Sequence, residues 1–259
     1  MCPPDYYEVA YEINPWMSTQ RKVDQKKAKK EWENYYRLLS EKFKVKVELL
    51  TPVRDLPDLV FTANGGLVYK KIFIPANFRH KERQPEKRFF EEWFKKRDWQ
   101  IKKIPSVIHF EGEGDALFLG EELYTGYHFR SDLEAHEFVA GSLEVNHTAL
   151  ELKDRRFYHL DTCFAPLDEK TALVYLPAFE PYSQQVLKET VSDLIEVSEK
   201  EALQFACNAA VMDKEVVLNV GCPETEKALR LRDFNPHALD FSEFIKAGGA
   251  AKCLILSVP

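Results

Sequence analysis

Hydrophobic and polar positions first follow a helical period and then a strand period. In residues 18–45, large apolar side chains recur every three or four positions among charged ones, which predicts an amphipathic helix. These apolar positions are Trp32, Tyr35, Tyr36, Leu39 and Phe43. The alternating stretch "KVKVELL" at 44–50 then predicts a strand.

From residue 57 onward the pattern repeats. Each unit starts with a polar or acidic motif beside a short apolar run, turns into a second apolar run, and is followed by a helical pattern. The units begin near residues 57, 110, 157, 205 and 251, which are 46 to 53 residues apart. The predicted helices cover 85–97, 131–141, 181–191 and 223–231. The last unit, "AKCLILSVP", needs a partner strand, and "YYEVAYEI" at 6–13 is the candidate.

A period of this length is typical of a repeat architecture in which no unit can bury its own apolar face. Five units closed in a ring would bury these faces together and leave few free strand edges. The predicted fold class is therefore α/β, a five-bladed pseudo-symmetric propeller of hairpin-plus-helix units. The alternative is a generic α+β domain with accidental spacing. No low-complexity linker interrupts the chain, which predicts one domain over residues 1–259.

Composition narrows the classes of function. The 259 residues are 45% hydrophobic and 30% charged, with a net charge of −6, which argues against a nucleic-acid partner. The first residues lack a signal-peptide pattern, and no apolar run approaches the roughly 20 residues that span a bilayer. Five scattered cysteines without CxxC spacing argue against a metal site and a disulfide framework. We expect a cytoplasmic protein with no cofactor and no membrane partner; a homo-oligomer stays open.

The ring geometry predicts that polar motifs at the same phase of each repeat meet in one pocket. His159 and Cys253 are the first pair to consider, because an imidazole can stabilise a thiolate and later move protons. Either residue alone is more often a packed core group than a reactive one. The same phase carries the stretch from Asp58 to Asn64, while Asn208 and Asn219 of the fourth unit are less distinctive.

Carboxylates extend this pattern. On a strand, Asp161 would share a face with His159, and "FEGEGD" places Glu111, Glu113 and Asp115 on one face if it is extended. A pocket rich in carboxylates suits a planar guanidinium, which donates bidentate hydrogen bonds. Arg83 and Arg130 follow strand hairpins and could clamp a substrate carboxylate; the alternative for each is a surface ion pair.

These motifs together resemble the guanidino-group-modifying superfamily with the pentein fold. The matching stretches are "PDLVFTANGG", "FEGEGD", "GYHFR", "YHLDTCF", "NVGCPE" and "GGAAKCL". The superfamily includes dimethylarginine dimethylaminohydrolases, arginine deiminases and amidinotransferases. "MCPPDYYEVAYEINPWM" and "FTANGG" resemble the arginine dihydrolase branch most.

The resemblance implies a role for each matching residue. It implies that Cys253 is the nucleophile and His159 the general acid/base, with Asp161 and Glu111 as guanidinium ligands. It implies that the remaining site residues bind substrate or line the pocket. These are Asn14, Asp58, Asn64, Arg83, Asp115 and Arg130.

Two positions distinguish the branches of the superfamily. The methylarginine hydrolases usually carry a lysine where this chain has Asp161. They and the deiminases carry an aspartate where this chain has Asn64. The dihydrolase branch has an asparagine there, as this chain does. An amide both donates and accepts, so Asn64 could hold a neutral ureido group for a second attack.

The resemblance implies attack of Cys253 on the guanidinium carbon of arginine through a covalent S-alkylthiouronium, giving ornithine, ammonia and carbon dioxide. The alternatives are hydrolysis of dimethylarginine to citrulline and dimethylamine, arginine deimination, amidino transfer, or a catalytically silent binding module.

Overall fold

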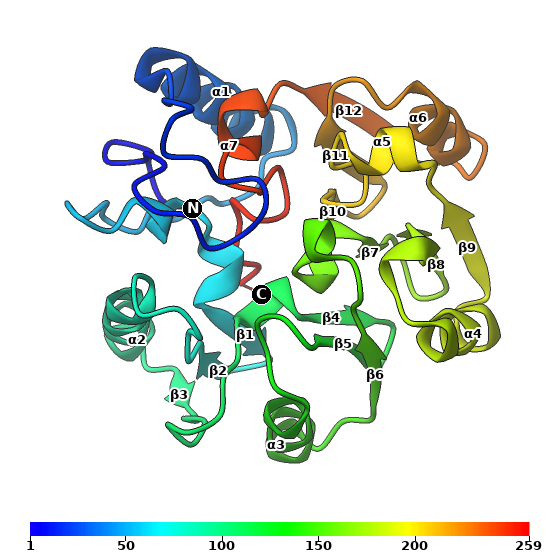
Figure 1. Cartoon of the computed structure of the whole chain (residues 1–259), viewed down its shortest axis with the longest axis horizontal. Coiled ribbons are helices and arrows are strands. Elements are labelled where there is room, and N and C mark those ends of the chain that lie inside the picture. The colour runs from blue at the N-terminus through cyan, green and yellow to red at the C-terminus, as the bar shows by residue number, and fades with distance from the viewer. Residues whose placement is uncertain (259) are drawn as a thin grey trace.

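The computed structural model describes residues 1–258, in which four three-stranded sheets of one design surround a common centre (Figure 1). In each unit the first two strands form an antiparallel hairpin, and the third strand returns parallel to the second after a helix. A parallel return needs such a crossover, because a tight turn cannot reverse the chain twice. The helices of the four units lie on the outside and the hairpins face the centre (Figure 1).

The four units occupy successive parts of the chain. The first contains β1 (Gly66–Tyr69), β2 (Ile72–Pro75), α2 (Lys87–Lys95) and β3 (Gln100–Ile101). The second contains β4 (Ala116–Leu119), β5 (Glu122–Tyr127), α3 (Leu133–Leu143) and β6 (His147–Glu151). The third contains β7 (Phe164–Pro166), β8 (Thr171–Val174), α4 (Pro181–Thr190) and β9 (Asp193–Glu196). The fourth contains β10 (Ala210–Met212), β11 (Glu215–Asn219), α6 (Pro223–Arg230) and β12 (Asn235–Leu239).

Short helical segments connect these units. Two are single α-turns, α5 (Glu199–Ala202) and α7 (Ser242–Ile245). Seven are 3₁₀ turns: η2 (Pro57–Val60), η3 (Thr62–Gly65), η4 (Gln84–Glu86), η5 (Gly112–Gly114), η6 (Arg155–Phe157), η7 (Leu160–Thr162) and η8 (Leu176–Ala178).

The N-terminal helix is shorter than the sequence pattern predicts. Helix α1 (Gln25–Arg37) begins after Asp24, whose carboxylate accepts hydrogen bonds from the amides of Lys26 and Lys27. An aspartate at this position satisfies amides that have no partner inside the helix and so fixes its first turn. The helix continues as a π-helical segment η1 (Leu38–Lys42), so it covers 25–42 where the pattern predicted 18–45.

The prediction of a fifth sheet is wrong for the described residues. The three stretches 6–13, 44–50 and 255–258 contain no assigned strand and pair in no sheet. Instead, α1 and α7 contact each other in the remaining sector (Figure 1). A buried cluster fills the core of this sector, with Tyr7, Trp32, Tyr35, Phe241, Phe244 and Leu254 among its members. Aromatic packing thus replaces strand pairing in this sector.

Within the described residues, no helix is both long enough and apolar enough to cross a membrane.

Candidate active site

A tight turn repeated at the entrance of each unit brings the predicted polar residues together. In the first three units a 3₁₀ turn closes with a backbone hydrogen bond of 3.2 Å, from Asn64 to Phe61, Gly114 to Glu111 and Thr162 to His159. The turn before β10 closes in the same way, from Asn208 to Phe205 (3.0 Å). The same phase of the repeat therefore presents a polar side chain toward the centre in each unit.

Glu111 joins the second and third units. Its Oε2 lies 2.8 Å from His159 Nε2 and accepts from Arg130 Nη1 at 2.9 Å. Burial opposes the charged carboxylate, but Arg130 and His159 hold the pKa of Glu111 well below its usual range. A carboxylate in this position orients the imidazole and fixes which ring nitrogen faces away from it. That free nitrogen is His159 Nδ1, which has no hydrogen-bond partner.

Cys253 lies on a turn between α7 and the C-terminal segment, buried and without strand pairing. Its Sγ donates to Asp161 Oδ2 at 3.2 Å and accepts from Asn208 Nδ2 at 3.2 Å. Burial and the neighbouring Asp161 raise the pKa of this thiol well above its usual value. Burial also raises the pKa of Asp161 to about 7. The ligand-free site therefore holds a protonated thiol.

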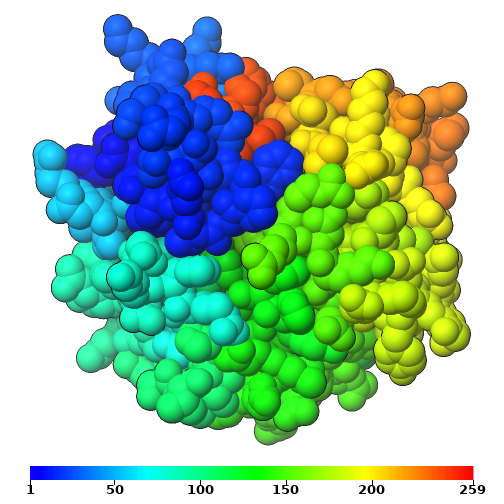
Figure 2. Space-filling view, in the orientation of Figure 1, coloured from blue at the N-terminus to red at the C-terminus, as the bar shows by residue number. Residues whose placement is uncertain are grey.

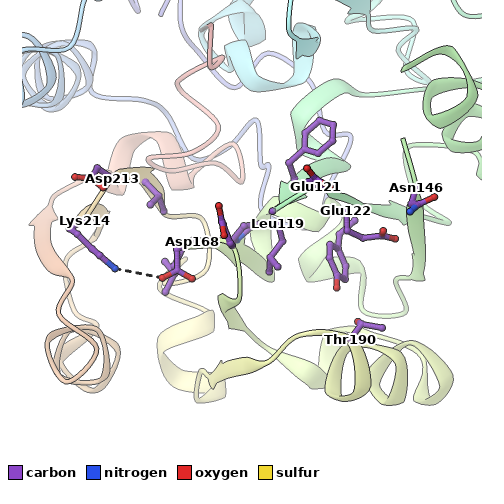
Figure 3. Close-up of a pocket in the computed structure, with 15 residues that line it drawn as sticks. Leu119, Glu121, Glu122, Asn146, Asp168, Thr190, Asp213 and Lys214 are labelled. Atoms are coloured by element: carbon purple, nitrogen blue, oxygen red, sulfur yellow. Dashed lines mark ion pairs between the residues drawn. The ribbon is translucent and has the colours of Figure 1, made fainter. Parts of the chain in front are cut away.

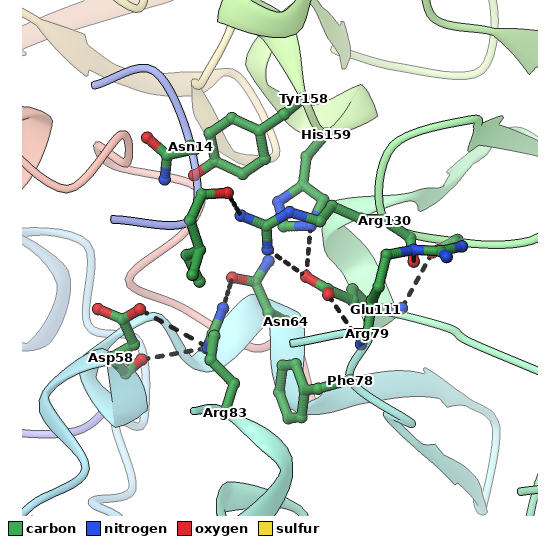
Figure 4. A network of polar contacts seen from close by, with 12 residues as sticks. Asn14, Asp58, Asn64, Phe78, Arg79, Arg83, Glu111, Arg130, Tyr158 and His159 are labelled. Carbon is green, nitrogen blue, oxygen red and sulfur yellow. Dashed lines mark hydrogen bonds and ion pairs between the residues drawn. The ribbon is translucent and has the colours of Figure 1, made fainter. Parts of the chain in front are cut away.

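Arg83 is buried in the first unit and is held on several sides (Figure 4). Its Nε and Nη2 form a fork with the carboxylate of Glu86 at 2.9 and 2.8 Å. Its Nη1 donates to Asn64 Oδ1 (2.7 Å) and its Nη2 to the carbonyl of Asp58 (3.1 Å). A guanidinium has five N–H donors, so Arg83 keeps one uncommitted.

Arg130 is less committed than Arg83. It donates to Glu111 and, through Nη2, to the carbonyl of Ile13 at 3.0 Å, and its guanidinium lies over the Tyr158 ring at 4.6 Å (Figure 4). Three of its five donors have no hydrogen-bond acceptor in the described residues.

Four polar atoms of these residues are buried without a partner. They are Asp58 Oδ1, Asn64 Nδ2, His159 Nδ1 and Asp161 Oδ1, out of six such side-chain atoms in residues 1–258. Buried polar atoms in folded proteins are normally paired, so such a concentration indicates a ligand site. Two of the atoms are seen to converge: a Cβ on Gly114 would lie 2.5 Å from Asn64 Nδ2 and 3.2 Å from His159 Nδ1.

Asp115 and Asn14 hold backbone in this structure. Asp115 Oδ2 accepts from Ser131 (2.7 Å) and Oδ1 from the amide of Leu160 (3.0 Å), which fixes the turn after His159. Burial raises the pKa of Asp115 to about 6. Asn14 donates to the carbonyl of Ala247 at 3.0 Å and caps its own turn at Trp16.

The N-terminal segment closes the site from outside. The segment around residues 7–17 lies on the face shown in Figure 2 and is anchored across the molecule. Trp16 Nε1 donates to the carbonyl of Arg156 at 2.7 Å, and Tyr7 donates to the carbonyl of Glu243 at 2.8 Å. His159 and Glu111 have no exposed surface, and Cys253 is 2% exposed.

A separate surface groove of about 1010 Å³ lies between the hairpin turns of the second, third and fourth units (Figure 3). It is lined by Glu121, Asp168 and Lys214, among others, and none of the predicted site residues lines it. In residues 1–258, no group of three or more His, Cys, Asp and Glu side chains is arranged to hold a metal ion.

Asn208, Glu86 and Tyr11 belong to the site but have little signal in the sequence. Tyr11 donates to Asp58 Oδ2 at 3.0 Å. The repeat phase predicts that Asn208 lies in the fourth unit near the centre, but the sequence gives no sign of its hydrogen bond to Cys253. Arg83 and Glu86 stand three residues apart, a spacing that could have indicated their pairing.

Comparisons with known proteins find similar chains over the whole length of this one. A family model for eukaryotic N,N dimethylarginine dimethylhydrolase matches residues 10–258. The bifunctional arginine dihydrolase/ornithine cyclodeaminase ArgZ of a Synechocystis species is 41% identical over 263 residues, covering all of this chain but 37% of ArgZ. The dimethylarginine dimethylaminohydrolase of Mycobacterium tuberculosis is 38% identical over 258 residues and is covered to 84%.

Among solved structures, the N-terminal domain of ArgZ, as a cysteine-to-serine variant bound to substrate, superposes with a TM-score of 0.94 at 40% identity. The superposition covers 99% of this chain and 96% of that domain. The fold is therefore a mixed α/β fold of the pentein type.

Proposed function

Because the chain belongs to the N,N-dimethylarginine dimethylhydrolase family, we propose that it is a cysteine-dependent hydrolase of the guanidinium carbon of arginine, producing ornithine, ammonia and carbon dioxide. The main support is the set of four unpartnered buried polar atoms, one of which belongs to Asp161, the acceptor of the Cys253 thiol. The similarity over the whole chain to the arginine dihydrolase domain adds to it. The chain spans about 37% of the length of the bifunctional relatives, so only the first of their two activities is proposed here.

The guanidinium would take Asp161, whose Oδ1 is free and whose Oδ2 accepts from the Cys253 thiol, with Glu111 and Asn64 as further partners. Asp58, whose Oδ1 is also free, would bind the substrate nearer to Arg83. The substrate carboxylate would take the uncommitted donors of Arg130, with the remaining donor of Arg83. Asn14 and the segment that follows it would cover the bound molecule, and Asp115 would hold the turn that carries His159.

Chemistry would begin when the bound cation lowers the pKa of the Cys253 thiol. The sulfur forms a bond to the guanidinium carbon, an amino group leaves as ammonia, and the thiol proton ends on that ammonia through His159. His159 then removes a proton from water, which replaces sulfur on carbon and gives citrulline. Glu111 orients His159 for both transfers. Positioning and charge stabilisation would supply most of the acceleration.

A second round at the ureido carbon would complete the conversion. Summed over both rounds, arginine and two waters become ornithine, two ammonia molecules and carbon dioxide. Asn64 is the residue that we assign to this round, because its free Nδ2 can donate to a neutral ureido oxygen where a carboxylate could not.

Dimethylarginine is the second candidate substrate. The family model and the relative from Mycobacterium tuberculosis both carry this activity in their names. Release of dimethylamine would then replace the first release of ammonia. Deimination, amidino transfer and a silent binding module have no comparable support.

The decisive experiment incubates the purified protein with arginine and, separately, with dimethylarginine, and identifies the products by chromatography. Ornithine from arginine is expected, whereas dimethylamine from the second incubation alone would move dimethylarginine ahead. Asn64→Asp should shift the product of arginine toward citrulline. Unchanged ornithine output from this variant would contradict the role of the amide.

We further infer a single catalytic domain over residues 1–259. The five-unit ring stays a proposal, with its fifth sector built from α1, α7 and the C-terminal segment. A cytoplasmic location and the possibility of a homo-oligomer likewise remain predictions.

A further inference from the structure

The side chain of Asn208, in the turn before β10, makes four hydrogen bonds, and all of them reach Cys253 or its immediate surroundings. Its Oδ1 accepts from the amides of Ala250 (2.9 Å) and Cys253 (3.3 Å). Its Nδ2 donates to the carbonyl of Asp161 (3.0 Å) and to Cys253 Sγ (3.2 Å). The side chain is fully buried, so no water competes for these bonds.

These partners fix the orientation of the amide. Reversing it would point the NH₂ group at two backbone N–H groups and the oxygen at the Asp161 carbonyl, so every backbone bond would be lost. The group beside the sulfur is therefore an N–H donor. Since the thiol proton is directed to Asp161 Oδ2, the Asn208 donor meets a lone pair of the sulfur.

We propose that Asn208 is a positioning residue of the nucleophile, which fixes the Cys253 turn through its oxygen and stabilises the ionised sulfur through its N–H group. This inference rests on the proposed function and adds a residue to the same site. The N–H group of Asn208 donates to the sulfur at 3.2 Å, and the backbone amide of Ala250 acts on the thiol in the same direction. A fixed donor aimed at a developing negative charge is a strong form of electrostatic stabilisation, because it needs no reorganisation during the reaction.

The other charged and titratable groups around the sulfur do not supply this donor. Asp161 accepts from the thiol, and Lys252 is paired with Glu113. Tyr35 and Tyr158 interact with the thiol electrostatically, but their hydroxyls donate to the carbonyls of Ala251 and Gly248. Burial and Asp161 raise the pKa of the thiol, and donation from Asn208 acts in the opposite direction.

The test replaces Asn208 in two ways. Asn208→Ser removes the donor and most of the reach without adding charge. Asn208→Asp keeps an acceptor for the two amides and removes the donor. Asn219 on β11 provides matched controls, Asn219→Ser and Asn219→Asp, because it is 3% exposed and bonds only to backbone, at Gln204, Val220 and Phe241.

Two readouts separate positioning from folding. The first is the pH dependence of Cys253 alkylation by iodoacetamide in the ligand-free protein, resolved by peptide mass spectrometry. Both Asn208 variants should move the midpoint upward by about one pH unit or more. The second is steady-state kinetics, in which kcat should fall about 100- to 1000-fold with little change in KM. The Asn219 variants should keep the wild-type alkylation profile even if they lower the melting temperature.

Each outcome decides something. A folded Asn208 variant with the wild-type alkylation profile overturns the assignment. Failure of both Asn208 variants to fold, while the Asn219 variants fold, also overturns it, because the side chain would then be only an anchor of the turn. If the wild type turns over neither arginine nor dimethylarginine but the profile still shifts, the proposed function fails and the assignment of Asn208 stands.

Discussion

Asp161→Asn should change the stability of the ligand-free protein in a way that depends on pH. Burial raises the pKa of Asp161 from 3.8 to about 7 in the folded state. The folded state thus holds this proton more tightly than the unfolded chain does. The stability linked to it is fully present below pH 3.8 and is lost as the pH rises through about 7.

The size of the effect follows from the same shift. A difference of about three pKa units at about 1.4 kcal/mol per unit gives a ceiling of about 4 kcal/mol between pH 4 and pH 8. The amide also has a constant cost, because its NH₂ group replaces an unpartnered oxygen in a buried place, which costs about 1–3 kcal/mol at any pH. The variant should therefore be less stable than wild type near pH 4 and should overtake it near pH 8.

Urea unfolding followed by circular dichroism between pH 4.5 and 8.5 measures this difference. Burial raises the pKa of Glu86 to about 7 and that of Asp115 to about 6, so both titrate in the same range. Their contributions to stability are the same in the two proteins and cancel in the difference. Asp193→Asn is a control of opposite sign, because Arg232 lowers the pKa of that surface carboxylate. A difference between wild type and Asp161→Asn that stays flat across this range would refute the reasoning.

Two further changes test the site directly. Cys253→Ser should abolish turnover while calorimetry still detects arginine binding, because the carboxylates and arginines are untouched; retained activity would rule out its role as nucleophile. Gly114→Ala should lower kcat sharply, because its Cβ would lie 2.5 Å from Asn64 Nδ2 and displace the group beside His159. Gly141→Ala in α3, where a Cβ meets nothing within 4 Å, should instead raise stability by about 1 kcal/mol. Equal activity of the two alanine variants would contradict the crowding at Gly114.

The repeat period was readable from the sequence because each unit is amphipathic in the same order. The four helices predicted between the hairpins lie within three residues of the observed ends of α2, α3, α4 and α6. The fifth sheet was wrong for a physical reason. Alternation at 44–50 predicts a strand, but strand pairing also needs a partner backbone in register, and Val45 and Leu49 of this stretch are exposed. Here the Leu50 amide bonds to the carbonyl of Met1, and the sector is filled by aromatic packing.

The sequence predicts which polar side chains come together in the site, but not which hydrogen-bond partners each of them has. The carboxylates, His159 and Cys253 stand at one phase of the repeat, and so their convergence could be inferred. The pairing of Arg130 with Glu111 could not be inferred, because it joins residues 19 apart and depends on their rotamers, whereas the spacing of Arg83 and Glu86 could have indicated their pairing. The role of Asn208 could not be predicted, because it depends on hydrogen bonds to backbone amides and to the sulfur of Cys253, which is 45 residues away in the sequence.

The charges of the site favour a cationic substrate. Arg83 and Arg130 are each paired with a buried glutamate, Glu86 and Glu111. Burial raises the pKa of Asp161 to about 7. A guanidinium bound beside Asp161 would favour its charged form and would help to ionise the Cys253 thiol. For the first attack, substrate binding and activation of the nucleophile would then be one electrostatic event. The second attack, on the neutral ureido group, would lack this help and would depend on His159 as the base and on the free Nδ2 donor of Asn64.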